Sequence, residues 1–99
     1  MLLAIDVGNT HTVLGVYDGD ALVGHWRIGT RARETADELG VLVHSLFRAP
    51  GSGLPADATI DAAILSSVVP PLTDTLVQMV AKSFPGVRCK VVGPGLKTG

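Results

Sequence analysis

The 99-residue sequence lacks the features that mark secreted, membrane-spanning and strongly charged proteins. Cys89 is the one cysteine, so no internal disulfide can form, which fits a reducing cytosol. No apolar run reaches the roughly 18 residues of a membrane span, and no signal peptide is visible near the N-terminus. A formal net charge of -1 gives no electrostatic attraction to nucleic acids or anionic membranes. We therefore expect a cytoplasmic protein with no nucleic acid and no membrane among its partners.

Most of the hydrophobic residues in the chain are aliphatic. Hydrophobic residues make up 46% of the sequence and the mean hydropathy is +0.40, whereas aromatic residues make up only 4%. The core is therefore expected to consist of valine, leucine, isoleucine and alanine side chains. The chain length suits one domain of ordinary size.

The most informative segment is the first polar one, which follows the apolar run Met1–Ile5. Asp6 places a carboxylate where a buried strand is expected to end, and Gly8 allows a sharp turn and the close approach of a ligand. Asn9 and Thr10 add an amide and a hydroxyl, and a second apolar run then leads back. A hairpin tip with one carboxylate, free backbone amides and short hydroxyls suits a phosphate with its Mg²⁺ ion.

Apolar periodicity and turn residues predict an α/β domain. The expected strands cover residues 1–5, 12–17, 21–28, 61–67 and 87–92, and the expected helices cover residues 35–47 and 70–84. Right-handed crossovers would place the last two strands parallel to the first, in the order of a ribonuclease H-like fold. Because ligands bind beyond the carboxyl ends of parallel strands, Asp6, Ser66 and Gly93 are expected to meet at one edge of the sheet.

Several segments carry a resemblance to a known family; they are Asp6–Thr10, Ser66–Pro70, Gly93–Gly99 and, more weakly, Arg27–Thr30 with Thr35–Glu38. In this order along the whole chain they resemble the type III pantothenate kinases, members of the actin-like sugar-kinase superfamily. The resemblance implies a mixed five-stranded sheet, with three antiparallel strands followed by parallel strands flanked by helices. Residues 1–99 would form the amino-terminal, nucleotide-phosphate-binding domain, and the second domain of such kinases would be absent from this chain.

The resemblance also implies a site and its ligands. The backbone amides of Gly8, Asn9 and Thr10 would hold phosphate oxygens of ATP, and Asp6 would orient Mg²⁺ through water. The nucleotide-binding residues would be Asp6, Val7, Gly8, Asn9, Thr10, His11, Thr12 and Val13. The chain would hold no catalytic residue, because the family's base is an aspartate in a Gly-x-Asp-Arg segment beyond Gly99. The complete enzyme would need a monovalent cation (potassium or ammonium) and would be a homodimer that binds pantothenate near the subunit interface.

Other polar residues have structural alternatives. Ser66 or Ser67 could contact an anion at the start of the second helix, or could cap structure near that helix. Lys97 could contact phosphate or be a solvated loop charge, and His11 is interpreted as a solvated turn residue. No P-loop is present, because Leu96 precedes Lys97 where a glycine is required.

The remaining titratable residues favour structural roles. Thr35 and Glu38 have the spacing of a capping box, so Asp37 and Glu38 fit the first turn of a helix better than a catalytic pair. His44 lies off the apolar stripe of that helix and is expected to be exposed. Cys89 is interpreted as a small buried residue of the last strand.

The expected function is transfer of the ATP γ-phosphate to the primary hydroxyl of pantothenate, the first step of coenzyme A synthesis. One wall of a two-domain cleft is not sufficient for this reaction, so the isolated chain is expected to be inactive. The alternative is a non-catalytic or regulatory relative that binds nucleotide phosphate without turnover. A metal-dependent nuclease is disfavoured, because that chemistry requires clustered carboxylates and Asp6 has no evident partner.

Overall fold

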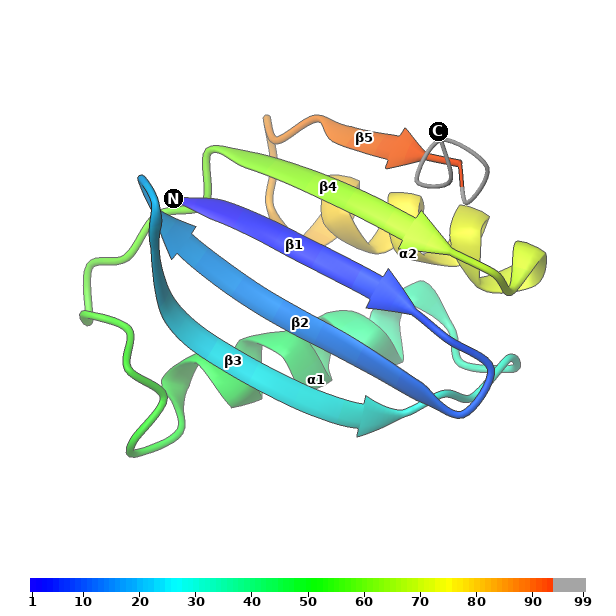
Figure 1. Cartoon of the computed structure of the whole chain (residues 1–99), viewed down its shortest axis with the longest axis horizontal. Coiled ribbons are helices and arrows are strands. Elements are labelled where there is room, and N and C mark those ends of the chain that lie inside the picture. Colours follow the sequence, from blue (N-terminus) through cyan, green and yellow to red (C-terminus); the bar gives the residue numbers. More distant parts are fainter. Residues whose placement is uncertain (94–99) are drawn as a thin grey trace.

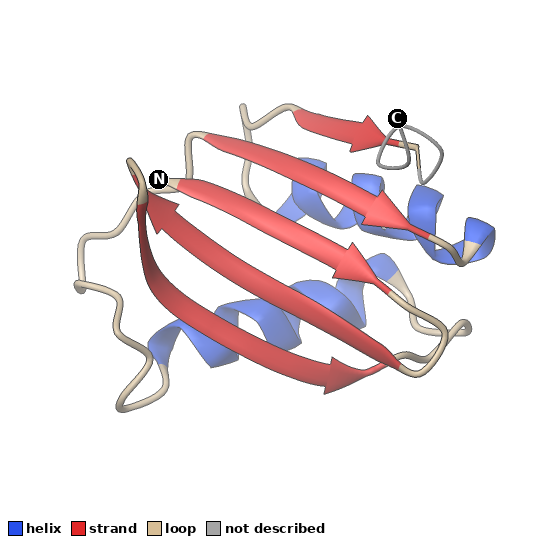
Figure 2. Cartoon of the chain, viewed as in Figure 1, coloured by secondary structure: helices blue, strands red, loops and turns tan. Residues whose placement is uncertain are grey.

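The computed structural model describes residues 1–93 and shows one mixed sheet with two helices on one of its faces (Figures 1 and 2). The strands are β1 (Leu2–Val7), β2 (His11–Asp18), β3 (Ala21–Gly29), β4 (Ala62–Ser67) and β5 (Cys89–Val92), and the helices are α1 (Ala36–Arg48) and α2 (Pro70–Ser83). Every predicted element is present, with small differences at the ends. None of the described helices is long and apolar enough to cross a membrane.

The strands lie in the order β3-β2-β1-β4-β5 across the sheet. β1 pairs antiparallel with β2 and β2 with β3, whereas β4 runs parallel to β1 and β5 parallel to β4. The β2–β3 turn contains Gly19 at a φ of 61°, a conformation that glycine adopts without steric cost. The predicted topology is thus confirmed, and the carboxyl ends of β1, β4 and β5 lie at one edge of the sheet (Figure 1).

Successive side chains along the central strands point to opposite faces of the sheet. The helices cover one face, here called the covered face, and the other is called the open face (Figure 1). The strand residues under the helices are at most 3% exposed; they are Leu3, Ile5, Val7, Leu14, Val16, Ala63 and Leu65. Helix side chains complete this core, namely Leu39, Val43, Leu72, Leu76, Met79 and Val80. Burial of this apolar surface is the main stabilising term of the domain. Cys89 packs against the same core, partly buried, and burial raises the pKa of its thiol.

The start of α1 confirms the predicted capping box. The Glu38 amide donates to Thr35 Oγ1 at 3.1 Å, and the Thr35 amide donates to Glu38 Oε1 at 3.0 Å. The backbone and side-chain hydrogen bonds from Thr35 lower the pKa of the Glu38 carboxyl. Asp37 pairs with Lys82 of α2. Both acids are therefore engaged in helix structure, as the sequence predicted.

The prediction that His44 is exposed is wrong. Its ring is half-buried and stacks on Phe84 with ring centroids 4.9 Å apart, and its Nε2 lies 3.1 Å from the Ser83 carbonyl oxygen. The two helices approach closely here because Gly40 has no side chain; a Cβ at Gly40 would lie 2.3 Å from Ser83 Oγ. The buried face of α1 is therefore wider than its apolar stripe.

Candidate functional site

Asp6 lies inside β1, not after its end as predicted. The strand continues to Val7 because that side chain fills the core and the ladders with β2 and β4 extend to it. Asp6 is therefore exposed on the open face, directly before the hairpin tip. Its neighbours across the sheet are Val13 of β2 and Ser66 of β4.

The tip of the β1–β2 hairpin offers two free amides instead of three. The Gly8 amide donates to the His11 carbonyl oxygen at 2.9 Å, so the hairpin itself uses it. The amides of Asn9 and Thr10 donate to no group among residues 1–93. Glycine is favoured at position 8, since a Cβ there would make a tight contact of 3.1 Å with the same His11 oxygen. The expected phosphate contact through amides is thus narrowed to Asn9 and Thr10, both exposed.

Thr30, directly after β3, is hydrogen-bonded to the hairpin tip through both its side chain and its backbone. Its hydroxyl donates to the Gly8 carbonyl oxygen at 2.8 Å and lies 2.9 Å from the Thr12 hydroxyl, while its amide donates to the Thr10 carbonyl oxygen at 2.9 Å. Thr12 is buried, so Thr30 supplies the partner that its hydroxyl needs. Sequence reasoning gave Thr30 no role of its own; the available signal was its place in the Arg27–Thr30 segment.

The eight residues predicted to bind nucleotide divide into three groups. Two point into the covered face and are buried, namely Val7 and Thr12. Two lie on the open face, namely Asp6 and Val13. The other four form or border the tip, namely Gly8, Asn9, Thr10 and His11. The exposed groups that a triphosphate could reach are therefore the Asp6 carboxylate and the tip.

The start of α2 uses its backbone amides within the described part of the chain. Its first two residues, Pro70–Pro71, have no N–H to donate. The Val68 amide donates to the Val7 carbonyl oxygen at 3.0 Å, and the Val69 amide donates to Ser67 Oγ at 3.1 Å. The next two amides of the helix donate to the Val69 carbonyl oxygen. These amides are therefore not free to bind an anion, and Ser67 has the structural role that was its alternative. An anion contact by Ser66 stays a prediction.

A magnesium ion fits this edge of the sheet as a hydrated ion. Within residues 1–93, no three histidine, cysteine, aspartate or glutamate side chains cluster as a metal cage would require. Mg²⁺ keeps several waters and is commonly held by one or two carboxylates plus substrate phosphates, a role that Asp6 can fill. Ser66, opposite Asp6 in the parallel ladder, adds a buried hydroxyl without a partner in the described chain. The single carboxylate also counts against the nuclease.

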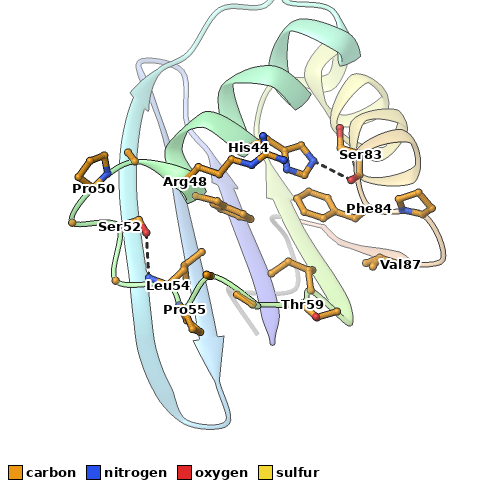
Figure 3. A pocket seen from close by; sticks show the side chains of 18 residues that line it. His44, Arg48, Pro50, Ser52, Leu54, Pro55, Thr59, Ser83, Phe84 and Val87 are labelled. Carbon is orange, nitrogen blue, oxygen red and sulfur yellow. Dashed lines mark hydrogen bonds between the residues drawn. The ribbon is translucent and has the colours of Figure 1, made fainter.

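Another cavity lies at the other end of the sheet (Figure 3). It has a volume of about 760 Å³ and is framed by the loop 49–60 and by Phe47 and Phe84. His44 and Arg48 also line it, but no acidic residue of the described chain does. Because this loop precedes β4, the cavity lies away from the carboxyl ends, where ligands of parallel sheets bind. It is therefore not the candidate magnesium–nucleotide site.

Gly93 follows β5 directly, as the last described residue. Its position at the carboxyl end of β5 agrees with the predicted edge. Lys97 and the rest of the segment 94–99 lie outside the described residues. A phosphate contact by Lys97 stays a prediction.

Comparisons of the sequence with known proteins identify its family. The model of the family described as type III pantothenate kinase matches residues 2–99. The chain belongs to the type III pantothenate kinase family. It is 54% identical to the enzymes so named from Geobacter sulfurreducens and Pelobacter propionicus, and 52% identical to that from Myxococcus xanthus. Each match covers all of this chain and 37% of the relative, so the chain spans little more than a third of these kinases.

Solved structures with low sequence identity share the fold of this family member. A ROK hexokinase from Thermus thermophilus superposes with a TM-score of 0.62 at 16% identity, over 93% of this chain and 33% of the hexokinase. A putative N-acetylglucosamine kinase from Porphyromonas gingivalis gives 0.61 at 19% identity, over 94% and 34% of the two chains. RuvC from Thermus thermophilus gives 0.53 at 20% identity, over 94% and 61%. The predicted ribonuclease H-like fold is thus confirmed.

Proposed function

We propose that the full-length protein, meaning the complete product of the gene that encodes this chain, phosphorylates pantothenate with ATP. The product is 4'-phosphopantothenate, and the reaction is the first step of coenzyme A biosynthesis. The observation that carries this proposal is 54% identity, over the whole chain, to proteins named type III pantothenate kinase. These relatives give no support to the alternative of a regulatory protein without turnover.

In this proposal the β1–β2 tip binds the triphosphate of ATP. The amides of Asn9 and Thr10 donate to phosphate oxygens, and Thr30 keeps the tip in place through the Gly8 carbonyl oxygen. The Asp6 carboxylate would hold the magnesium ion by accepting hydrogen bonds from its water. Bound Mg²⁺ supplies positive charge that neutralises the phosphates. The contribution of this chain is therefore positioning, which is most of what a protein provides to phosphoryl transfer.

The rest of the active site is expected in the part of the relatives that this chain does not span. That part would supply the aspartate base and the adenine pocket, so the 99-residue chain alone is expected to be inactive. The proposal further includes a monovalent cation (potassium or ammonium), a homodimer with pantothenate near the subunit interface, and a cytoplasmic location. Gel filtration of the full-length protein and assays with potassium replaced by sodium test two of these points.

The direct test is an assay of the full-length protein with ATP, magnesium, potassium and pantothenate, with the products identified by mass spectrometry. We expect 4'-phosphopantothenate and ADP in equal amounts, and no product when magnesium or pantothenate is left out. The 99-residue chain is the matched control and should form no product. ATP binding without any phosphopantothenate would contradict the kinase proposal and support the regulatory alternative.

A further inference from the structure

Ser66 lies next to Asp6 at the candidate site, between β1 and β5. It is the last but one residue of β4, and its backbone pairs with Asp6 of β1 on one side and Val92 of β5 on the other. Its neighbour in the strand, Leu65, is fully buried under the helices, so alternation places the Ser66 side chain on the open face with Asp6. Both residues line one cavity of about 430 Å³ on that face.

The Ser66 hydroxyl is buried and has no hydrogen-bond partner within residues 1–93. Ser67 is the opposite case, because its hydroxyl bonds to the backbone amide and carbonyl of Val69, each at 3.1 Å. A buried hydroxyl without a partner destabilises a folded protein, and native structures rarely leave one. An alanine at this position would carry no such cost, so the hydroxyl points to a hydrogen bond that forms when a ligand binds.

The surroundings of Ser66 restrict what that partner can be. Among the other side chains that line the cavity, Ala4, Val13, Ile64 and Val92 are apolar and offer no hydrogen bond. Tyr17 and His25 also line it, but they lie further along the sheet, where Tyr17 pairs with Leu2 and His25 with Gly15. Asp6 is the adjacent polar group, and an ionised carboxylate accepts but does not donate. Neighbouring strands lie only about 4.8 Å apart, so rotation of the two side chains, or one water between them, joins the hydroxyl to the carboxylate.

We infer that Ser66 is a positioning residue for Asp6. When the magnesium–nucleotide complex binds, the Ser66 hydroxyl donates to the Asp6 carboxylate, directly or through one water. The other carboxylate oxygen is then held toward the hydration shell of the magnesium ion. Hydrogen bonds of this kind fix the orientation of groups around a metal ion and raise its affinity by tenfold or more. The inference rests on the proposed function, because it assigns to Asp6 a magnesium–nucleotide ligand.

The test compares Ser66→Ala with its matched control, Ser67→Ala, in the full-length protein. ATP binding is measured by calorimetry over a range of magnesium concentrations, and the melting temperature is measured without ligands. For Ser66→Ala we expect a melting temperature equal to or above that of the wild type. We also expect an about tenfold rise in the magnesium concentration needed for half-maximal ATP binding, the effect of losing one hydrogen bond to a charged group.

The control and the conservative variant separate positioning from a structural role. Ser67→Ala should lower the melting temperature without changing the magnesium requirement, and Ser66→Thr, which keeps a hydroxyl, should restore most of that requirement. A Ser66→Ala protein that melts at lower temperature with an unchanged magnesium requirement overturns the inference, and so does one with no change in either. If the wild type itself shows no magnesium-dependent ATP binding, the proposed function fails, and the inference fails with it.

Discussion

The two faces of the sheet use the same strands for different purposes. On the covered face, β1 and β4 present Leu3 and Leu65, both fully buried under the helices. On the open face the same strands present Asp6, which is exposed, and Ser66, whose hydroxyl has no partner in the described chain. The covered face has no such unsatisfied group among residues 1–93, because Thr12 bonds to Thr30.

This difference shows that alternate residues of one strand can have different roles, one set stabilising the fold and the other facing the candidate site. Side chains at the covered positions gain free energy by leaving water, which requires no ligand. The polar side chains at the carboxyl end of the open face gain little in the unliganded protein. The proposed function explains their presence by the nucleotide that would bind there.

The largest expected effect is a loss of stability on the covered face. Leu65→Ala should lower the free energy of unfolding of the full-length protein by about 2–5 kcal/mol, because it leaves a cavity in a core that cannot fully collapse. Leu22→Ala, at a position that is 49% exposed on the open-face side, is the matched control. It should cost less than about 1 kcal/mol. Urea denaturation measures both, and equal losses would contradict the division between the faces.

The next effect is on catalysis at the open face. Asp6→Asn in the full-length protein should lower kcat/KM for ATP about 10²–10³-fold, because it removes the charge that orients the hydrated magnesium ion. Its melting temperature should stay close to that of the wild type, since the carboxylate makes no hydrogen bond or ion pair within the described chain. Asp20→Asn, at the β2–β3 turn, is the control and should keep full activity. Steady-state kinetics that fail to separate these variants would refute the role of Asp6.

A smaller effect is expected at the tip of the β1–β2 hairpin. Thr30→Val removes the hydrogen bond to the Gly8 carbonyl oxygen and leaves the buried Thr12 hydroxyl unpaired, which should cost about 1–3 kcal/mol of stability. The double variant Thr12→Val with Thr30→Val should recover part of this loss, because no hydroxyl is then left unpaired. Strictly additive losses in urea denaturation would show that the two hydroxyls do not interact.

The smallest effect lies away from both faces, at the α1 cap. The Thr35 hydrogen bonds lower the pKa of Glu38 below its ordinary value of 4.5, so the ionised carboxyl stabilises the folded state. This contribution is present above about pH 4.5, the ordinary carboxyl pKa, and is lost as the pH falls through the lower folded-state pKa. Glu38→Gln should therefore show a shallower loss of melting temperature on acidification than the wild type. Parallel curves for the two proteins would contradict the assignment.

The sequence predicted the fold well because its signals are local and repeat along the chain. The Thr35–Glu38 capping box, the turn at Gly19 and the apolar alternation each determine a nearby element, and right-handed crossovers determine their order. The end of β1 was missed because Asp6 looks like a strand terminator, whereas burial of Val7 extends the strand past it.

The sequence predicted that Asp6, Ser66 and Gly93 lie at one edge of the sheet, but it did not predict the hydrogen bonds of the hairpin tip. The use of the Gly8 amide by His11, and the support of the tip by Thr30, depend on segments brought together by the sheet. The burial of His44 likewise depends on the close approach of α2 at Gly40. The apolar pattern of a single segment carries no information about contacts with distant segments. The sequence therefore predicted which elements hold these residues but not their hydrogen-bond partners.

The most direct test of the account follows the backbone amides of the full-length protein by NMR during titration with magnesium and a non-hydrolysable ATP analogue. We predict that the largest shifts fall on the amides of Asn9 and Thr10, with a smaller shift at Thr30. The amides of the loop 49–60, beside the larger cavity, should not move. Shifts concentrated in that loop, with an unchanged tip, would contradict the claim that this edge of the sheet binds the triphosphate.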